Sequence, residues 1–159
     1  MTSASKNTKE RFLPDTFVIA HKLCFVIHDV MVQILKFGEE GNFFQTTIDL
    51  KNDDEKTSLE NTDDIFFWLE NNHRFDDRAK ILITTIFPAV LSDMMHCTYE
   101  SLETSRKAKL GISYMLIRRP LQESLYLLES IVLDELGFSK MMANDPLKLR
   151  SKNAECRRC

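Results

Sequence analysis

The sequence predicts an all-α protein, an antiparallel helical bundle of three long helices with additional short helices. Apolar residues recur at spacings of three and four over three long stretches, which is the pattern of helices with one buried face. Glycine and proline number only four each, too few for a turn-rich sandwich or barrel. Hydrophobic residues make up 43% of the chain and charged residues 28%, as is typical of a soluble globular protein.

The chain of 159 residues is long enough for one domain with terminal extensions. We expect a disordered lead over residues 1–13 and a helical bundle domain over residues 14–137. A short helix and a basic tail are expected over residues 138–159. The three long helical patterns all fall within residues 14–137.

The first long helix is expected to begin at Pro14, because proline is tolerated in a first turn, and to end at Gly38, a residue typical of C-caps. One of its faces carries apolar residues at spacings of three and four, which indicate a stripe that faces the core. Further apolar residues lie on its other faces, more than a three-helix core covers, so we expect a homodimer. The stripe consists of Leu23, Ile27, Val30, Ile34 and Phe37.

The segment after this helix is expected to be mostly irregular. Residues 42–50 fit either a short strand or a connection, and we favour the connection because the rest of the chain offers no second strand. Residues 51–64 are charged and polar and are expected to form an exposed loop. A short helix is expected from Asp64 to Asn71, with Thr62 or Asp63 as its capping residue.

Two more long helices follow. The second is expected from Asp76 to Lys107, with a kink at Pro88 because proline removes a backbone hydrogen bond. The third is expected from Leu110 to Leu136, kinked or restarted at Pro120 and ended by Gly137.

Composition and charge exclude several function classes. The formal net charge of −3 does not mark the chain as a nucleic-acid binder. The four glycines do not form the glycine-rich loops that hold nucleotide phosphates, and no cofactor is expected. Residues 1–11 lack the apolar core of a secretory signal, and the most apolar stretch, residues 17–37, carries charges that a bilayer would bury at high cost. We therefore expect a cytoplasmic protein without a membrane partner.

The cysteines fall into two pairs. Cys24 and Cys97 lie in apolar helical patterns and are expected to be reduced core residues. Cys156 and Cys159 form a CxxC motif close to the C-terminal end. No second pair of ligands accompanies this motif, which favours a mobile tail, with metal or redox chemistry as the alternative.

The most unusual motif is a pair of arginines followed by a proline within the third apolar helix, Arg118, Arg119 and Pro120. Arg119 and Glu123 are one turn apart and are expected to form an ion pair, and Tyr126 lies on a neighbouring row. Guanidinium groups bind a phosphate or a carboxylate with two hydrogen bonds, so these two arginines, Glu123 and Tyr126 are the candidate ligand-binding residues. The alternative, which we favour, is a structural network of arginine and glutamate side chains that joins the kinked helix to its neighbour, with at least one arginine paired to a buried carboxylate. Its removal would then cost about 3–5 kcal/mol.

Asp93, His96 and Glu100 fall on one face of the second long helix and form the candidate metal site. Imidazole and carboxylate groups suit zinc or iron, and His28 and Asp29 would extend the site if the first helix is adjacent. A di-iron bundle needs two Glu-x-x-His motifs, and the sequence offers one approximate half. We favour the alternative, in which these residues form the solvated face of an amphipathic helix and hold no metal.

A long helix over residues 76–107, followed by the Arg-Pro-Leu-x-Glu motif that begins at Arg119, resembles a group of bacterial helical bundles related to the HEPN superfamily (higher eukaryotes and prokaryotes nucleotide-binding). The likeness covers residues 65–136. HEPN ribonucleases use an Arg-x4–6-His motif at a dimer interface, whereas Glu123 and Glu129 stand here where a histidine would follow the arginine pair. The resemblance therefore implies a non-catalytic bundle more readily than a ribonuclease, in the context of defence or toxin–antitoxin systems.

The sequence leaves two classes of function open. We favour a small helical interaction module that self-associates in a bacterial defence or toxin–antitoxin context, because no catalytic histidine accompanies the arginines. A second copy of the chain is the first expected partner, and another protein is the second. The alternative is a divergent HEPN-type ribonuclease, or a nucleotide- or phosphate-binding protein, that uses Arg118 and Arg119 on RNA or a nucleotide. A non-enzyme is thus favoured.

Overall fold

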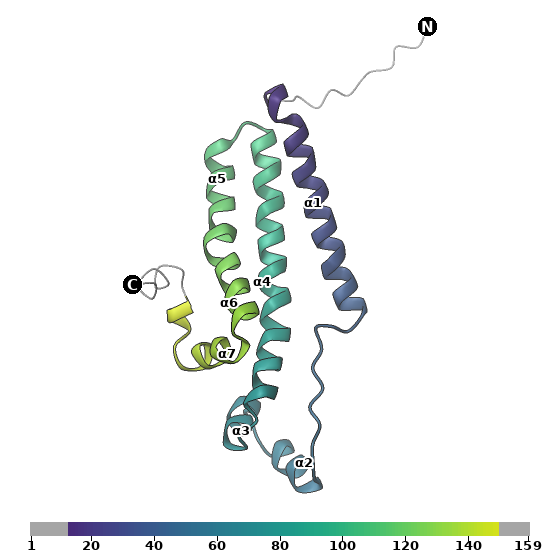
Figure 1. Ribbon diagram of the computed structural model, residues 1–159, viewed down its shortest axis with the longest axis vertical. Helices are drawn as coiled ribbons and strands as arrows, with labels where there is room; N and C mark the ends of the chain where they lie inside the picture. Colours follow the sequence, from purple (N-terminus) through teal and green to yellow (C-terminus); the bar gives the residue numbers. More distant parts are fainter. Residues whose placement is uncertain (1–12, 150–159) are drawn as a thin grey trace.

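The computed structural model describes residues 13–149, and all regular structure over those residues is helical (Figure 1). The all-α prediction is confirmed. The expectations for the N-terminal lead, for the basic tail and for the CxxC motif of Cys156 and Cys159 lie outside the described residues. In chain order the elements are α1 (Asp15–Glu40), α2 (Asp53–Glu60), α3 (Ile65–Asn71), α4 (Phe75–Arg106), α5 (Leu110–Arg119), the π-helical turn η1 (Pro120–Ser124), α6 (Leu125–Leu133), α7 (Glu135–Asn144) and the 3-10 turn η2 (Pro146–Leu149).

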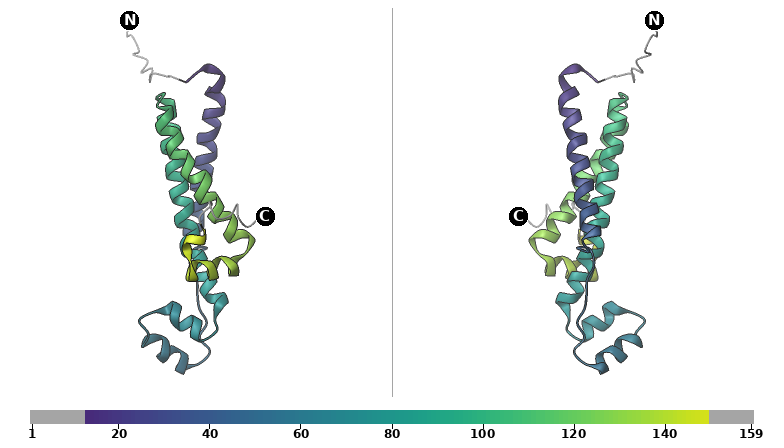
Figure 2. Two further views of the ribbon diagram at one scale, coloured as in Figure 1. Left: turned by 90° about the vertical axis from the view of Figure 1, so that its left-hand side faces the viewer. Right: turned by 90° about the vertical axis from the view of Figure 1, so that its right-hand side faces the viewer.

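Helix α4 lies between the other two long segments (Figures 1 and 2). α1 packs along one side of it, and α5, η1 and α6 pack along another, with neighbouring long segments running in opposite directions. α4 continues as a helix through Pro88, where the sequence predicted a kink. α1 and α5 share no comparable contact within the described residues, so α4 is the common support of both.

The buried hydrophobic cluster lies where α7 folds back against the first half of α4. Ile131 of α6, Phe138 of α7 and Leu149 of η2 are buried there. Their burial fixes the C-terminal elements on α4, and α1 contributes no residue to this cluster. Half-buried side chains complete it, namely Ile83, Ile86, Phe87, Leu127, Met141 and Met142.

α1 packs on α4 through a different face from the one that the sequence pattern indicated. Phe25 on this face contacts Tyr99 of α4, with ring centroids 5.9 Å apart. The predicted stripe from Leu23 to Phe37, which we call the outer stripe, is 53–65% exposed, so the prediction that it faces the core is wrong. Successive helical residues are rotated by about 100°, which puts the two stripes on opposite sides of α1, and α4 covers one of them. The half-buried residues on the α4 side are Val18, His21, Phe25, His28, Val32 and Leu35.

α1 does not end at Gly38 as predicted. This glycine lies inside the helix and lets another side chain pack against it. The helix continues to Glu40, and Gly41 is its C-cap. Gly38 is buried, and a Cβ atom at this position would lie 2.6 Å from the ring of Phe44. The absent side chain therefore lets Phe44 pack directly against the helix, where its ring centroid lies 6.4 Å from that of Phe87.

The connection between α1 and α3 is irregular only in its first part. The prediction of an exposed loop over residues 51–64 is wrong in part, because α2 forms within it. The first turn of α2 holds three acidic residues, which interact favourably with the positive end of the helix dipole. α3 begins at Ile65, one residue later than predicted, and its cap is Asp64, not Thr62 or Asp63, because the Asp64 carboxylate accepts hydrogen bonds from two backbone N–H groups of the first turn.

The third long segment is interrupted at Pro120, as predicted. α5 ends before it, and in the π-helical turn that follows, the N–H of Leu125 donates to the carbonyl of Pro120. The expected end at Gly137 is wrong. The helix already ends at Leu133, because Asp134 has an extended backbone and caps α7 by accepting a 2.8 Å hydrogen bond from the N–H of Gly137.

α1 and α4 are both long and apolar enough to cross a membrane, judged by length and composition alone. No residue in the apolar window of α1 is buried, and 11% of the window in α4 is buried. Cys24, expected in the core, is exposed on α1, because α4 covers the other side of that helix, whereas Cys97 of α4 is half-buried. α1 thus presents more apolar surface to its surroundings than a core helix does.

The side chain of Arg74 connects two parts of the chain to the start of α4. One is the segment just before α2, and the other is α2 itself. Its Nε donates to Asp77 and its Nη2 donates to the backbone carbonyl of Asp49, both at 2.7 Å. Its Nη1 lies 3.7 Å from the carboxylate of Glu55, and the guanidinium lies 5.9 Å from the ring centroid of Trp68. The Arg74 side chain is 15% exposed, so these interactions are only weakly screened by solvent.

Replacing Arg74 with alanine is expected to lower the free energy of unfolding by about 3 kcal/mol, because Asp77 and Glu55 would keep partly buried charges without a partner. Urea unfolding followed by circular dichroism measures this change. Lys80→Ala, at an exposed position of the same helix, is the control and should stay within about 0.5 kcal/mol of the wild type. A loss for Arg74→Ala no larger than for the control would contradict the role given to this arginine.

Candidate functional site

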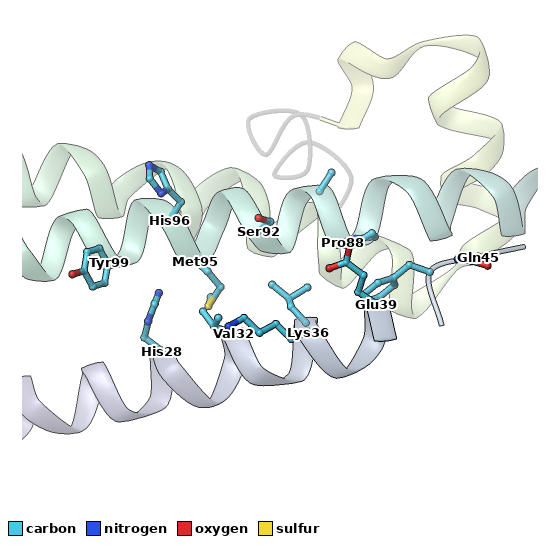
Figure 3. Close-up of a pocket in the computed structure, with 13 residues that line it drawn as sticks. His28, Val32, Lys36, Glu39, Gln45, Pro88, Ser92, Met95, His96 and Tyr99 are labelled. Carbon is cyan, nitrogen blue, oxygen red and sulfur yellow. The ribbon is translucent and has the colours of Figure 1, made fainter. Parts of the chain in front are cut away.

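A groove of about 840 Å³ opens between α1 and α4 (Figure 3). Its walls come from the second half of α1 and from the middle of α4, and Phe44 and Gln45, which follow α1 in the chain, also line it. Its volume is within the range of about 300–1,000 Å³ that is usual for small-molecule sites. Polar side chains line it beside apolar ones, and they are His28, Lys36, Glu39, Gln45, Ser92 and His96.

His28 projects from α1 toward α4, and its side chain is only 10% exposed. Its Nδ1 lies 3.2 Å from Oδ1 of Asp29, and because a carboxylate only accepts, Nδ1 carries the hydrogen. The ring packs against Tyr99, with centroids 5.4 Å apart. Within the described residues, Nε2 of His28 has no hydrogen-bond partner. The histidine therefore offers one nitrogen to the groove.

The predicted arginine site lies outside this groove, on exposed surface between α5 and α4. Nε of Arg119 lies 3.8 Å from the carboxylate of Glu123, which confirms the expected pair one turn apart, and Nη2 lies 3.9 Å from Asp93 of α4. Arg118 donates from Nε to the side-chain oxygen of Gln122 at 3.0 Å. The structure gives Tyr126 no hydrogen bond to either arginine within residues 13–149. The structure thus groups Arg119 and Glu123 with Asp93 and leaves Tyr126 apart.

The favoured structural network is present, because Arg119 lies between Glu123 and Asp93 of the neighbouring helix α4, but the prediction that its carboxylate is buried is wrong. The side chain of Arg119 is 67% exposed, and those of its partners Glu123 and Asp93 are 62% and 49% exposed. These groups point outward because Pro120 and Ser124, each one residue further along the chain, occupy the buried positions of the π-helical turn. Water screens ion pairs of this kind, so their net contribution to stability is small.

The candidate metal residues are not gathered into a site. Asp93 faces Arg119 instead of a metal position, and Figure 3 shows the ring of His96 turned away from His28. Within residues 13–149 no group of three or more histidine, cysteine, aspartate or glutamate side chains is placed to hold a metal ion. Asp29, the other proposed ligand on α1, pairs with His28, while Glu100 is half-buried on α4.

Comparison of the chain with protein-family models, with curated proteins and with solved structures finds no match in any of the three. The proposed function therefore rests on the exposed and buried side chains described above.

The sequence alone does not reveal the groove. It singles out both histidines of the groove, His28 and His96, as candidate metal ligands, but spacing along one helix does not show which groups a second helix brings opposite. Lys36 and Glu39 carry no signal in the sequence, since charged residues near a helix end are usually solvated. Nor does the sequence show that Phe44, which lines the groove, packs against Gly38, because it indicates a cap at that glycine.

We expect Arg119→Ala to lower the free energy of unfolding by no more than about 1 kcal/mol, because both of its ion pairs are exposed. Thermal unfolding by differential scanning calorimetry tests this, with Arg74→Ala as the variant of a buried arginine. A loss near 3 kcal/mol for Arg119→Ala would contradict the assignment of this arginine to the solvated surface.

Proposed function

We propose that the protein is a small helical interaction module that self-associates through the outer stripe of α1. The observation that carries this proposal is the exposure of a stripe whose spacing is that of a coiled coil. From Leu23 to Phe37 its residues follow at intervals of four, three, four and three, which is the a/d pattern of a heptad seam. A seam of this kind is stabilised when a second helix covers it.

The area of the outer stripe supports a partner of ordinary interface size. Ile19 and Val26 border it and are 81% and 57% exposed. A large apolar side chain presents roughly 150–250 Å² when fully exposed, so the stripe and these two residues together expose about 800 Å². That area exceeds the usual apolar patch of a monomer and equals the share that one partner contributes to a standard interface.

A second copy of the chain is the occupant that we favour, because each copy brings the same unpaired seam. Lys22 and Asp29 lie along one edge of the stripe and would form the polar rim that protein interfaces have. In such a dimer, the second copy would close the antiparallel arrangement of α1, α4 and α5 into a bundle with a continuous core. The HEPN-like resemblance and the defence or toxin–antitoxin context remain predictions that accord with a dimer.

The same apolar surface would also suit a membrane, but the charges on both helices favour a protein partner and a cytoplasmic location. Lys22 and Asp29 interrupt the apolar stretch of α1, and Asp93 interrupts that of α4. Each such charge inside a bilayer costs about 2.5–3.5 kcal/mol or more, whereas an interface rim accommodates it in water.

One observation favours the second candidate, an anion-binding surface at the arginine pair. Arg118 donates to the neutral side chain of Gln122, and its charge is not paired with a carboxylate within the described residues. The phosphate of an RNA or a nucleotide would supply the negative charge that pairs with this guanidinium group. In a filter-binding assay with RNA, this candidate predicts a loss of binding for Arg118→Gln and unchanged binding for Lys80→Gln, whereas equal binding by both variants would contradict it.

Sedimentation equilibrium tests self-association with two matched substitutions. Val30→Glu places a charge in the outer stripe, and Val132→Glu makes the same change at an exposed valine of α6. We expect the wild type and Val132→Glu to have the mass of two chains at micromolar concentration, and Val30→Glu to have the mass of one chain.

The proposal would be contradicted by a wild type that stays a single chain at high micromolar concentration, or by equal dissociation of both variants. Recovery of the wild type only from the membrane fraction, with detergent required, would contradict the cytoplasmic assignment. Circular dichroism of Val30→Glu checks that the single chain keeps its helices.

A further inference from the structure

The groove between α1 and α4 lies on the side of α1 opposite to the outer stripe, so it is a separate surface from the proposed dimer interface. Val32 and Leu35 of α1 and Pro88 and Met95 of α4 form its apolar walls. Phe44, which packs against Gly38, also lines it. Side chains of this kind take up a hydrocarbon or aromatic group of a ligand.

The charged side chains of the groove point to different places along it (Figure 3). The side chain of Lys36 extends along α1 toward Val32 and His28, whereas the carboxylate of Glu39 points toward Pro88. No ion pair joins Lys36 to any residue of the described range. The part of the groove near His28 therefore holds an unpaired positive charge beside a histidine nitrogen without a partner.

We propose that this groove binds an amphipathic carboxylic acid, with the carboxylate between Lys36 and His28 and the hydrocarbon along the apolar walls. Lys36 supplies the opposite charge, and a charge-assisted hydrogen bond to a carboxylate is among the stronger polar contacts in proteins. An acid whose head is a single carboxylate matches one ammonium group and one imidazole, and its apolar part matches the rest of the lining.

A carboxylate accepts hydrogen bonds and does not donate them, so His28 contacts it through Nε2 only when both ring nitrogens carry a hydrogen. The imidazolium then donates Nδ1–H to Asp29 and Nε2–H to the ligand, so that both nitrogens are hydrogen-bonded. The titratable groups around His28 are Asp29 and Lys36 on α1 and Tyr99 on α4. His28 is the one among them that combines burial with a nitrogen lacking a partner.

Isothermal titration of the full chain with decanoate, below its micelle concentration, tests the proposal. We expect one binding site per chain, and His28→Leu should weaken decanoate binding about tenfold because it removes the hydrogen bond from Nε2. Lys36→Met keeps an apolar stem and removes the charge, and it should weaken decanoate binding about tenfold or more. Lys22→Met, on the same helix outside the groove, should bind as the wild type does.

Two further sets of binding measurements distinguish binding in the groove from binding to other apolar surface. Decan-1-ol has the same chain without the charge and should bind the wild type about as weakly as decanoate binds Lys36→Met. Ala89→Trp fills the groove and should abolish binding, whereas Val30→Glu in the outer stripe should leave it unchanged, so that failure of dimerisation and failure of this site are told apart. Equal binding of the acid and the alcohol, unchanged binding by Lys36→Met, absence of saturable binding, or loss in Val30→Glu with retention in Ala89→Trp would each overturn the proposal.

Discussion

The packing of α1 on α4 leaves much of the apolar surface of α1 uncovered, because α4 is the long helix against which α1 packs within residues 13–149. α1 has two apolar stripes on opposite sides, and one neighbouring helix can bury only one of them. The stripe that meets α4 is the more polar one, since it contains His21 and His28. His21 is accommodated because its Nε2 lies 3.1 Å from the carbonyl oxygen of Leu102 and 2.9 Å from Oγ of Ser105. The more hydrophobic outer stripe is left for a partner.

The two ends of α4 contribute differently to this arrangement. At its beginning, Arg74 and the cluster around Phe138 hold the short helices in place with buried contacts. Further along α4, where Leu91, Met95 and Ser101 are buried, α1 and α5 attach to different sides of the helix. Gly38 is the one buried residue of α1, and elements with few buried apolar contacts open most easily, so covering the outer stripe would stabilise α1. The groove near His28 lies between α1 and this part of α4.

The sequence was sufficient for the helical class and for the interruption at Pro120, because these follow from local periodicity and from the chemistry of proline. It misjudged which face of α1 meets α4, since periodicity reveals an apolar stripe but not its partner. Gly38 was misread because a buried glycine and a capping glycine look alike until Phe44 is seen against it. The arginine pair lies on the surface because Pro120 takes the buried position of its turn. The groove could not be predicted, because its walls come from α1 and α4, which are far apart in the chain.

Hydrogen–deuterium exchange followed by mass spectrometry, at several protein concentrations, tests the central claim that a second copy covers the outer stripe. The account predicts that the amides of residues 23–37 become more protected as the concentration rises, while those of α7, already fixed by the buried cluster, keep the same protection. Protection of residues 23–37 that is independent of concentration, or that rises equally in both segments, would contradict it.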